Sequence, residues 1–220
     1  MTLPTNQTRA NLLRAAEQLF AARGVESVSL REIARSAGAK NVIAVQYHFT
    51  DRDGVLRAIG DKHLPAVDAR RHALLDAAET DPTLRLMAAA LVRPLGAQLG
   101  DTDGGPEFLR VYADLLNRPR PQPTALEGDG GRFGSLRRWR EMVAPLLDPV
   151  GATLHPRLNA LLYTAVELAR RAEASPHTDD RLFISHLIDV VAAILSTPVS
   201  EETRRLSHER DQRRGQPPTP

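Results

Sequence analysis

Apolar residues recur every three to four positions along most of this 220-residue chain, and this spacing favours helices throughout. Near the start, Leu12, Ala16 and Phe20 fall on one face of a helix predicted over residues 5–23. Aromatic residues make up only 4% of the sequence, and much of the apolar content is alanine and leucine, which favour helices over strands. We therefore predict an all-α protein.

The composition excludes several classes of protein. The sequence has no cysteine, which excludes disulfides, thiolate metal sites and thiol nucleophiles. No stretch approaches the roughly 20 uninterrupted apolar residues that cross a bilayer, and residues 1–9 lack the apolar core of a signal peptide. We expect a cytoplasmic protein that has no membrane partner.

Positive charge is concentrated toward the N-terminus. Residues 1–65 carry nine Lys and Arg against six Asp and Glu, whereas the whole chain has a formal net charge of +2. An anionic partner is therefore expected at the N-terminal end.

A capping box follows the first helix and starts a second one. The Ser29 hydroxyl can accept a hydrogen bond from the backbone N–H of Glu32, and the Glu32 carboxylate can reach back. Gly24 before it and Gly38 after it permit the turns that end short helices. A third helix is predicted over residues 41–48. A fourth is expected to open where the box pattern recurs over residues 50–53 and to pass a kink at Pro65.

Two short helices joined by a glycine turn predict a helix-turn-helix, whose second short helix can enter the major groove of DNA. The spacing turns Val45 and Phe49 inward. The side chains then available outward are Lys40, Asn41, Ala44, Gln46, Tyr47 and His48. Gln46 can pair with an adenine edge and Ala44 can touch a thymine methyl group. The other donors, Lys40, Tyr47 and His48, can reach phosphate.

Three pieces of this region, Leu30-Arg31-Glu32-Ile33-Ala34, Ala37-Gly38 and Tyr47-His48-Phe49, resemble the N-terminal signature of the TetR/AcrR family of bacterial transcriptional regulators. The resemblance covers about residues 7–62. It implies a repressor whose helical C-terminal domain dimerises and binds a small-molecule effector that releases DNA.

The resemblance also implies roles for particular residues. Ser29 and Arg31 would contact phosphate or the groove edge, and Tyr47 and His48 the DNA backbone. Arg52, where such proteins usually have a lysine, would contact phosphate at the start of the fourth helix. The turn is one residue longer than in the commonest family pattern. Which of Lys40, Asn41, Val42 and Ile43 reaches the bases is therefore left open.

The rest of the chain shows five further helical patterns, over residues 82–99, 106–117, 135–147, 156–174 and 179–196, with a loop over 117–134. Beyond about residue 199 the sequence is charged and ends in Pro-Pro-Thr-Pro, so we expect disorder. The predicted organisation is a DNA-binding domain over 1–50, a connecting helix over 51–80, an effector-binding and dimerisation domain over 81–199, and a tail over 200–220.

The last two of these helices carry more apolar surface than one protomer core needs, and the resemblance implies that they pair across a two-fold axis. The residues expected at this homodimer interface are Leu158, Leu161, Leu162, Ala165, Leu187, Val190, Val191 and Ile194. A symmetric dimer complements an inverted-repeat operator in double-stranded DNA.

If the family architecture holds, the middle helices and the helix from residue 156 enclose the effector. The expected lining is Met87, Leu91, Arg93, Phe108, Tyr112, Trp139, Met142, Tyr163 and Val166. Each of these can also be ordinary core or surface, and the identity of the effector is not readable from them.

No catalytic pattern emerges from the sequence. His155, His177 and His186 lack partners at metal-ligand spacing, and Gly128-Asp129-Gly130-Gly131 lacks the lysine of a phosphate loop. We expect neither an enzyme nor a bound metal or cofactor. Two alternatives to a repressor stay open, namely an effector-binding sensor without DNA binding and a helical protein-interaction module.

Overall fold

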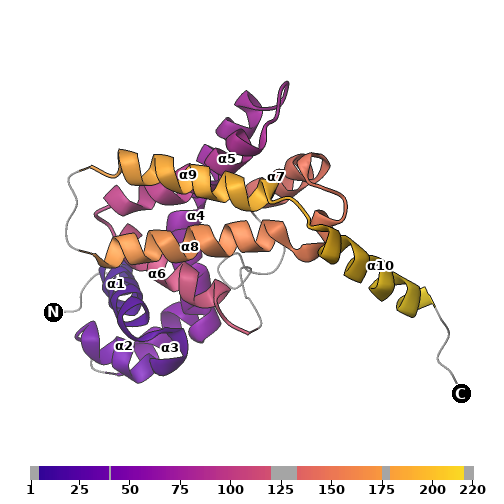
Figure 1. Ribbon diagram of the computed structural model, residues 1–220. Helices are drawn as coiled ribbons and strands as arrows, with labels where there is room; N and C mark the ends of the chain where they lie inside the picture. Colours follow the sequence, from indigo (N-terminus) through magenta and orange to yellow (C-terminus); the bar gives the residue numbers. More distant parts are fainter. Residues whose placement is uncertain (1–4, 40, 120–132, 175–178, 216–220) are drawn as a thin grey trace, which may run out of the picture.

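The computed structural model describes residues 5–39, 41–119, 133–174 and 179–215. Within these ranges every regular element is a helix, which confirms the all-α prediction (Figure 1). Helices α2 and α3 lie at one end of the molecule, and α8 and α9 run side by side across the opposite half (Figure 1).

The N-terminal unit consists of α1 (Thr5–Arg23), η1 (Val25–Ser27), α2 (Leu30–Ser36) and α3 (Ile43–Phe49). Helix α1 ends because Gly24 adopts a φ of 79°, and its N–H donates to the Phe20 carbonyl at 2.8 Å. Leu12, Phe20 and Ile33 are fully buried between these helices. Burial of these side chains stabilises the unit by about 1.5–3 kcal/mol each.

Helix α4 (Arg52–Ala77) is a single helix that continues through Pro65. It begins differently from the prediction. Asp51 is the N-cap and its Oδ1 accepts from the Gly54 N–H at 2.7 Å, whereas Thr50 closes α3 with a φ of 67°. The expected second capping box is therefore wrong, because the left-handed backbone at Thr50 places it in the turn and leaves the cap to Asp51.

The larger C-terminal unit is built from α5 (Leu84–Gly96), η2 (Ala97–Gly100), α6 (Gly105–Leu116), α7 (Ser135–Val143), η4 (Ala144–Leu146), η5 (Gly151–Leu154), α8 (Pro156–Glu173) and α9 (Arg181–Ser196). Helix α6 packs on α8, α5 packs on α9, and α4 packs on α5 and α7. The core includes Trp139, whose Nε1 donates to the Met87 carbonyl at 2.8 Å. Most of the loop predicted over 117–134 lies outside the described residues.

The expectation of disorder after residue 199 is wrong for residues 201–215, which form α10 (Glu201–Gly215). The Ser200 hydroxyl caps this helix by accepting from the Thr203 N–H at 3.2 Å, and Glu201 and Glu202 suit the positive end of its dipole. Helix α10 stands away from the body and is anchored near its start by an ion pair of 2.8 Å between Arg204 and Asp148 (Figure 1).

Among the described residues, no single helix has both the length and the apolar character needed to span a membrane. One strongly bent pair, Arg181–Ser196 with Glu201–Arg213, meets the length and composition criteria only when the two helices are taken together.

Candidate nucleic-acid interface

The start of α2 is held by the capping box that the sequence predicts. The Glu32 N–H donates to the Ser29 hydroxyl at 3.3 Å, and the Ser29 N–H donates to a Glu32 carboxylate oxygen at 2.9 Å. The backbone hydrogen bond from Ser29, followed by the hydrogen bond from Arg23, lowers the pKa of Glu32 to about 2. The carboxylate therefore stays charged at neutral pH and closes the capping box at the first turn of α2.

Helix α3 is anchored by two residues on its inner face. Val45 is fully buried and Phe49 is 5% exposed, as their spacing predicts. The opposite face presents Ile43, Gln46 and Tyr47, at i, i+3 and i+4, and Ile43 and Tyr47 are 62% and 78% exposed. A large apolar and a large aromatic side chain left in solvent next to an amide make a surface suited to base edges.

The predicted DNA contacts on α3 divide into several groups. Gln46 and Tyr47 are exposed, whereas Ala44 and His48 are half-buried. Ala44 is half-buried against the core, because it lies about 100° round the helix from the buried Val45, and its contact with DNA stays a prediction. Asn41 lies before the helix and its Oδ1 accepts from the Ile43 N–H at 3.1 Å. Lys40 lies outside the described residues.

Of the four residues that the sequence leaves open as base contacts, Ile43 is a candidate because it lies on the exposed face of α3. Ile43 is the first residue of α3, and its side chain meets solvent. An apolar side chain at this position can contact a thymine methyl group.

Two arginines from other helices lie near α3, namely Arg31 on α2 and Arg9 on α1. Arg31 is exposed on α2, with no ion-pair partner among the residues described. Arg9 on α1 lies over the Phe49 ring, with its guanidinium carbon 5.1 Å from the ring centroid. Arg9 is absent from the predicted contacts, because the packing of α1 against the end of α3 leaves no signal in the local sequence pattern.

Arg52 is engaged with the protein itself. Its guanidinium donates to a Glu26 carboxylate oxygen at 2.7 Å and to the Val28 carbonyl at 2.9 Å, and its side chain is 35% exposed. The expected phosphate contact therefore stays a prediction, and any phosphate that binds there has to share this guanidinium with Glu26.

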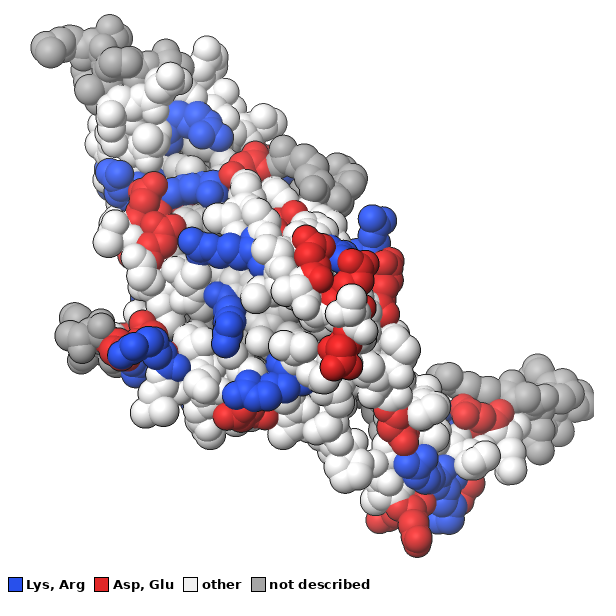
Figure 2. All heavy atoms as spheres, turned by 90° about the horizontal axis from the view of Figure 1, so that it is seen from above, with Lys and Arg blue, Asp and Glu red and all other residues white. Residues whose placement is uncertain are grey.

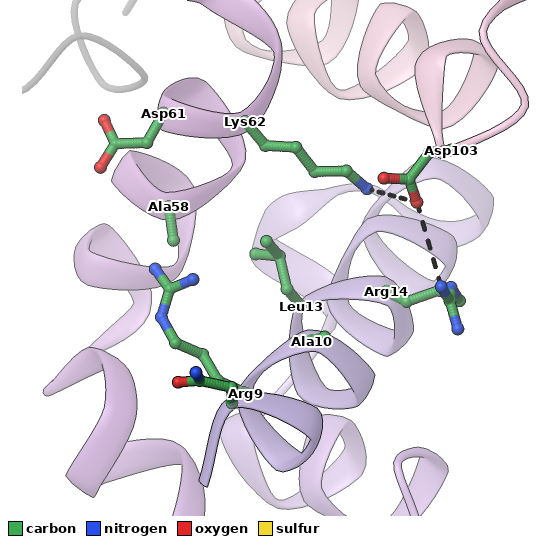
Figure 3. A pocket seen from close by; sticks show the side chains of 9 residues that line it. Arg9, Ala10, Leu13, Arg14, Ala58, Asp61, Lys62 and Asp103 are labelled. Atoms are coloured by element: carbon green, nitrogen blue, oxygen red, sulfur yellow. Dashed lines mark ion pairs between the residues drawn. The ribbon is translucent and has the colours of Figure 1, made fainter. Parts of the chain in front are cut away.

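A hollow of about 390 Å³ opens between α1 and α4 (Figure 3). Its lining includes Arg9, Arg14 and Lys62, and Asp103 accepts ion pairs from Arg14 at 4.0 Å and from Lys62 at 3.2 Å. Much of the positive charge in this hollow is thus neutralised within the protein. No group of three or more metal-ligating side chains gathers anywhere in the described ranges.

The predicted effector lining does not come together around one cavity. Met87, Leu91, Phe108 and Trp139 are packed in the core, Arg93 and Tyr163 are exposed, and Met142 and Val166 are half-buried. Only Tyr112 of this set borders the interior cavity of about 10 Å³ that lies beside α4 and α7. Ala88, Ala89 and Ala90 of α5 are buried in the core.

The predicted interface residues also divide by exposure. Leu161, Ala165, Leu187 and Val191 are buried inside the protomer, whereas Leu158 is 40% exposed and Leu162, Val190 and Ile194 are half-buried. Helices α8 and α9 use one face each to cover α6 and α5, so only the other face is open to a partner. Leu182, at the start of α9, is 83% exposed.

The surface seen from above carries separate basic and acidic groups with broad uncharged areas between them, and α10 stands out as an arm (Figure 2). In this view acidic side chains gather on one side of the body, whereas most basic side chains lie apart from one another.

A capped α2, a glycine turn and an α3 with a solvent-facing polar and aromatic surface define a helix-turn-helix DNA-binding protein. Residues 12–59 match the family described as bacterial regulatory proteins, tetR family. The N-terminal region is therefore similar to the DNA-binding region of tetR-family regulators, and the fold is that of a TetR-family transcriptional regulator.

Several solved structures are similar to this chain over most of its length. A mutant of the HlyIIR protein has the same fold, with a TM-score of 0.55, 17% identity, and coverage of 90% of this chain and 100% of that chain. A putative TetR-family transcriptional regulator from Rhodococcus sp. has a TM-score of 0.41 and 19% identity, over 87% of this chain and 100% of its own. A gamma-butyrolactone receptor described as ArpA-like has a TM-score of 0.39 and 24% identity, over 99% and 92%. None of the curated proteins searched matches this sequence.

Proposed function

We propose that the protein is a homodimeric repressor that binds an inverted-repeat operator and is released from it by a small-molecule effector. It acts through binding equilibria and not through catalysis. The observation that carries this proposal is the outward face of α3, where Ile43, Gln46 and Tyr47 are exposed above a fully packed inner face.

The faces of α8 and α9 that do not pack against α6 and α5 support the proposed dimer. Leu158 and Leu162 on α8, and Leu182, Val190 and Ile194 on α9, recur at multiples of four residues and so form one apolar stripe on each helix. Two copies joined through these stripes would present two α3 helices, which suits half-sites roughly 34–36 Å apart.

The cavity beside α4 supports an effector site from which α4 can carry a movement to the DNA-binding helices. Leu64, Val67 and Asp68 of α4 border it, and the buried Arg71 next to them donates to the Ala90 carbonyl at 3.2 Å and to the Ser135 hydroxyl at 3.1 Å. At about 10 Å³ it admits a larger molecule only if the helices part. An effector that prefers the parted conformer would shift α4, whose first turn adjoins α3.

The test is a mobility-shift assay with DNA that flanks the gene for this protein, together with sedimentation of the free protein. Gln46→Ala should change the order of preference among operator variants, because an amide pairs with particular base edges. Gln212→Ala, an exposed amide on α10, is the matched control and should leave this order unchanged.

A uniform loss on every duplex from Gln46→Ala would remove its base-reading role. A monomeric protein that binds no inverted repeat at low salt would overturn the repressor and favour a sensor or interaction module.

A further inference from the structure

We propose that Glu26 is an internal competitor of DNA phosphate for Arg52, and that Arg118 beside α6 sets how strongly it competes. This inference rests on the proposed function, since it assumes that the first turn of α4 faces DNA. It adds an electrostatic route from the C-terminal unit to the DNA-binding face.

Glu26 lies in η1 and bridges two arginines that are distant in sequence. Its Oε2 accepts from Arg52 at 2.7 Å and its Oε1 accepts from Arg118 at 2.9 Å. One carboxylate thus joins the start of α4 to the end of α6. Its side chain is 69% exposed, so solvent and ions reach this group.

Arg52 stands where a phosphate can reach it. It is the first residue of α4, and unpaired N–H groups at a helix start favour an anion. Its second bond, to the Val28 carbonyl at 2.9 Å, holds the guanidinium beside the turn that leads into α2. A phosphate oxygen that approaches this turn meets the Arg52 guanidinium, which already donates a hydrogen bond to Glu26.

Arg118 is fixed more firmly than Arg52. Its side chain is 17% exposed, and it donates to an Asp114 carboxylate oxygen at 3.1 Å. The same oxygen of Asp114 accepts from the Val25 N–H at 3.3 Å. The end of α6 is therefore attached to η1 by two carboxylates, and a displacement of α6 away from η1 must change the contact between Arg118 and Glu26.

The competition follows from charge. While Arg118 shares the Glu26 carboxylate, part of that negative charge is compensated, and Arg52 is easier for a phosphate to capture. When α6 carries Arg118 away, Glu26 is left with Arg52 as its partner and holds it more strongly. Movement of α6 therefore weakens DNA binding without any change in the spacing between two recognition helices.

The experiment measures operator affinity as a function of salt for the full-length protein and its variants. Glu26→Gln should raise affinity about three- to tenfold at low salt and steepen the slope of log K against log salt by about 0.9, because one more cation reaches phosphate. Arg118→Gln should do the opposite. Both effects should vanish when Arg52→Ala is added.

Glu141→Gln is the matched control, since it makes the same charge change at an exposed site on α7. Thermal melts identify the variants that fold. If Arg118→Gln does not fold, the effect of Glu26→Gln on operator affinity is compared between the wild-type and Arg52→Ala proteins. An unchanged salt slope for Glu26→Gln, or one equal to that of Glu141→Gln, would overturn this inference. The proposed function would still stand if the wild-type protein binds the operator. A wild-type protein that binds no duplex would overturn both.

Discussion

His63 and Glu17 form a buried contact that joins α4 to α1. The Nε2 atom of His63 lies 2.8 Å from Oε1 of Glu17, and the two residues are 2% and 1% exposed. Lys62 donates to the other Glu17 oxygen at 2.9 Å, and the Nδ1 atom of His63 lies 3.0 Å from Oε1 of Gln98 in η2. The His63 ring also stacks on Phe108 with centroids 4.7 Å apart. This cluster links the DNA-binding helices to the C-terminal unit.

We predict that Glu17→Ala lowers the free energy of unfolding by about 3–5 kcal/mol, because it leaves buried polar partners without their carboxylate. Urea denaturation measures the change. Glu141→Ala at an exposed site should change it by less than about 0.5 kcal/mol. A loss below about 1 kcal/mol for Glu17→Ala would show that solvent or a rearranged Gln98 replaces the carboxylate.

The capping box predicts a pH dependence. The pKa of Glu32 is lowered from 4.5 to about 2 in the folded state, first through the Ser29 backbone hydrogen bond and then through Arg23. Because the folded-state pKa is the lower one, its contribution to stability is complete above pH 4.5 and disappears as the pH falls toward 2.

Urea denaturation of wild type and Glu32→Gln between pH 6 and 2.5 should therefore show a stability difference that narrows in acid. A difference that stays constant with pH would mean that the charge of Glu32 does not stabilise the cap.

The two faces of α3 should separate folding from DNA binding. Phe49→Ala should destabilise the protein by about 3–5 kcal/mol, since it empties a buried site. Tyr47→Ala should change stability by less than about 0.5 kcal/mol and still weaken operator binding. Thermal unfolding and mobility shift on the same samples test both. Normal operator affinity in a folded Tyr47→Ala protein would remove this residue from the interface.

The proposed dimer makes Leu182 a sensitive position. Leu182→Glu places a charge in the apolar stripe of α9 and should shift the protein toward monomers in analytical ultracentrifugation. Leu206→Glu on α10, where the side chain is 49% exposed, should leave the oligomeric state unchanged. Equal sedimentation of both variants and wild type would place the contact between copies elsewhere.

Local patterns predicted much of the DNA-binding unit, because its determinants are close in sequence. The Ser29 and Glu32 box depends on residues three apart, and the inward positions of Val45 and Phe49 depend on the helical repeat. Ala44 is half-buried at the margin between the two faces of α3, where the helical repeat alone does not decide how exposed a side chain is. The disorder expected for the tail was wrong for residues 201–215, where the Ser200 cap and helix-compatible charges were underestimated.

Helical periodicity, one capping box and a glycine turn were enough to determine an all-α chain with a helix-turn-helix near its start, because each of these acts within a few residues. Only the tertiary structure decided which side chains remain available for partners. Arg52 meets Glu26, and Glu26 meets Arg118, across separations of 26 and 92 residues. The cavity of about 10 Å³ is likewise a product of tertiary packing, because side chains of α4, α5, α6 and α7 that are distant in sequence meet around it.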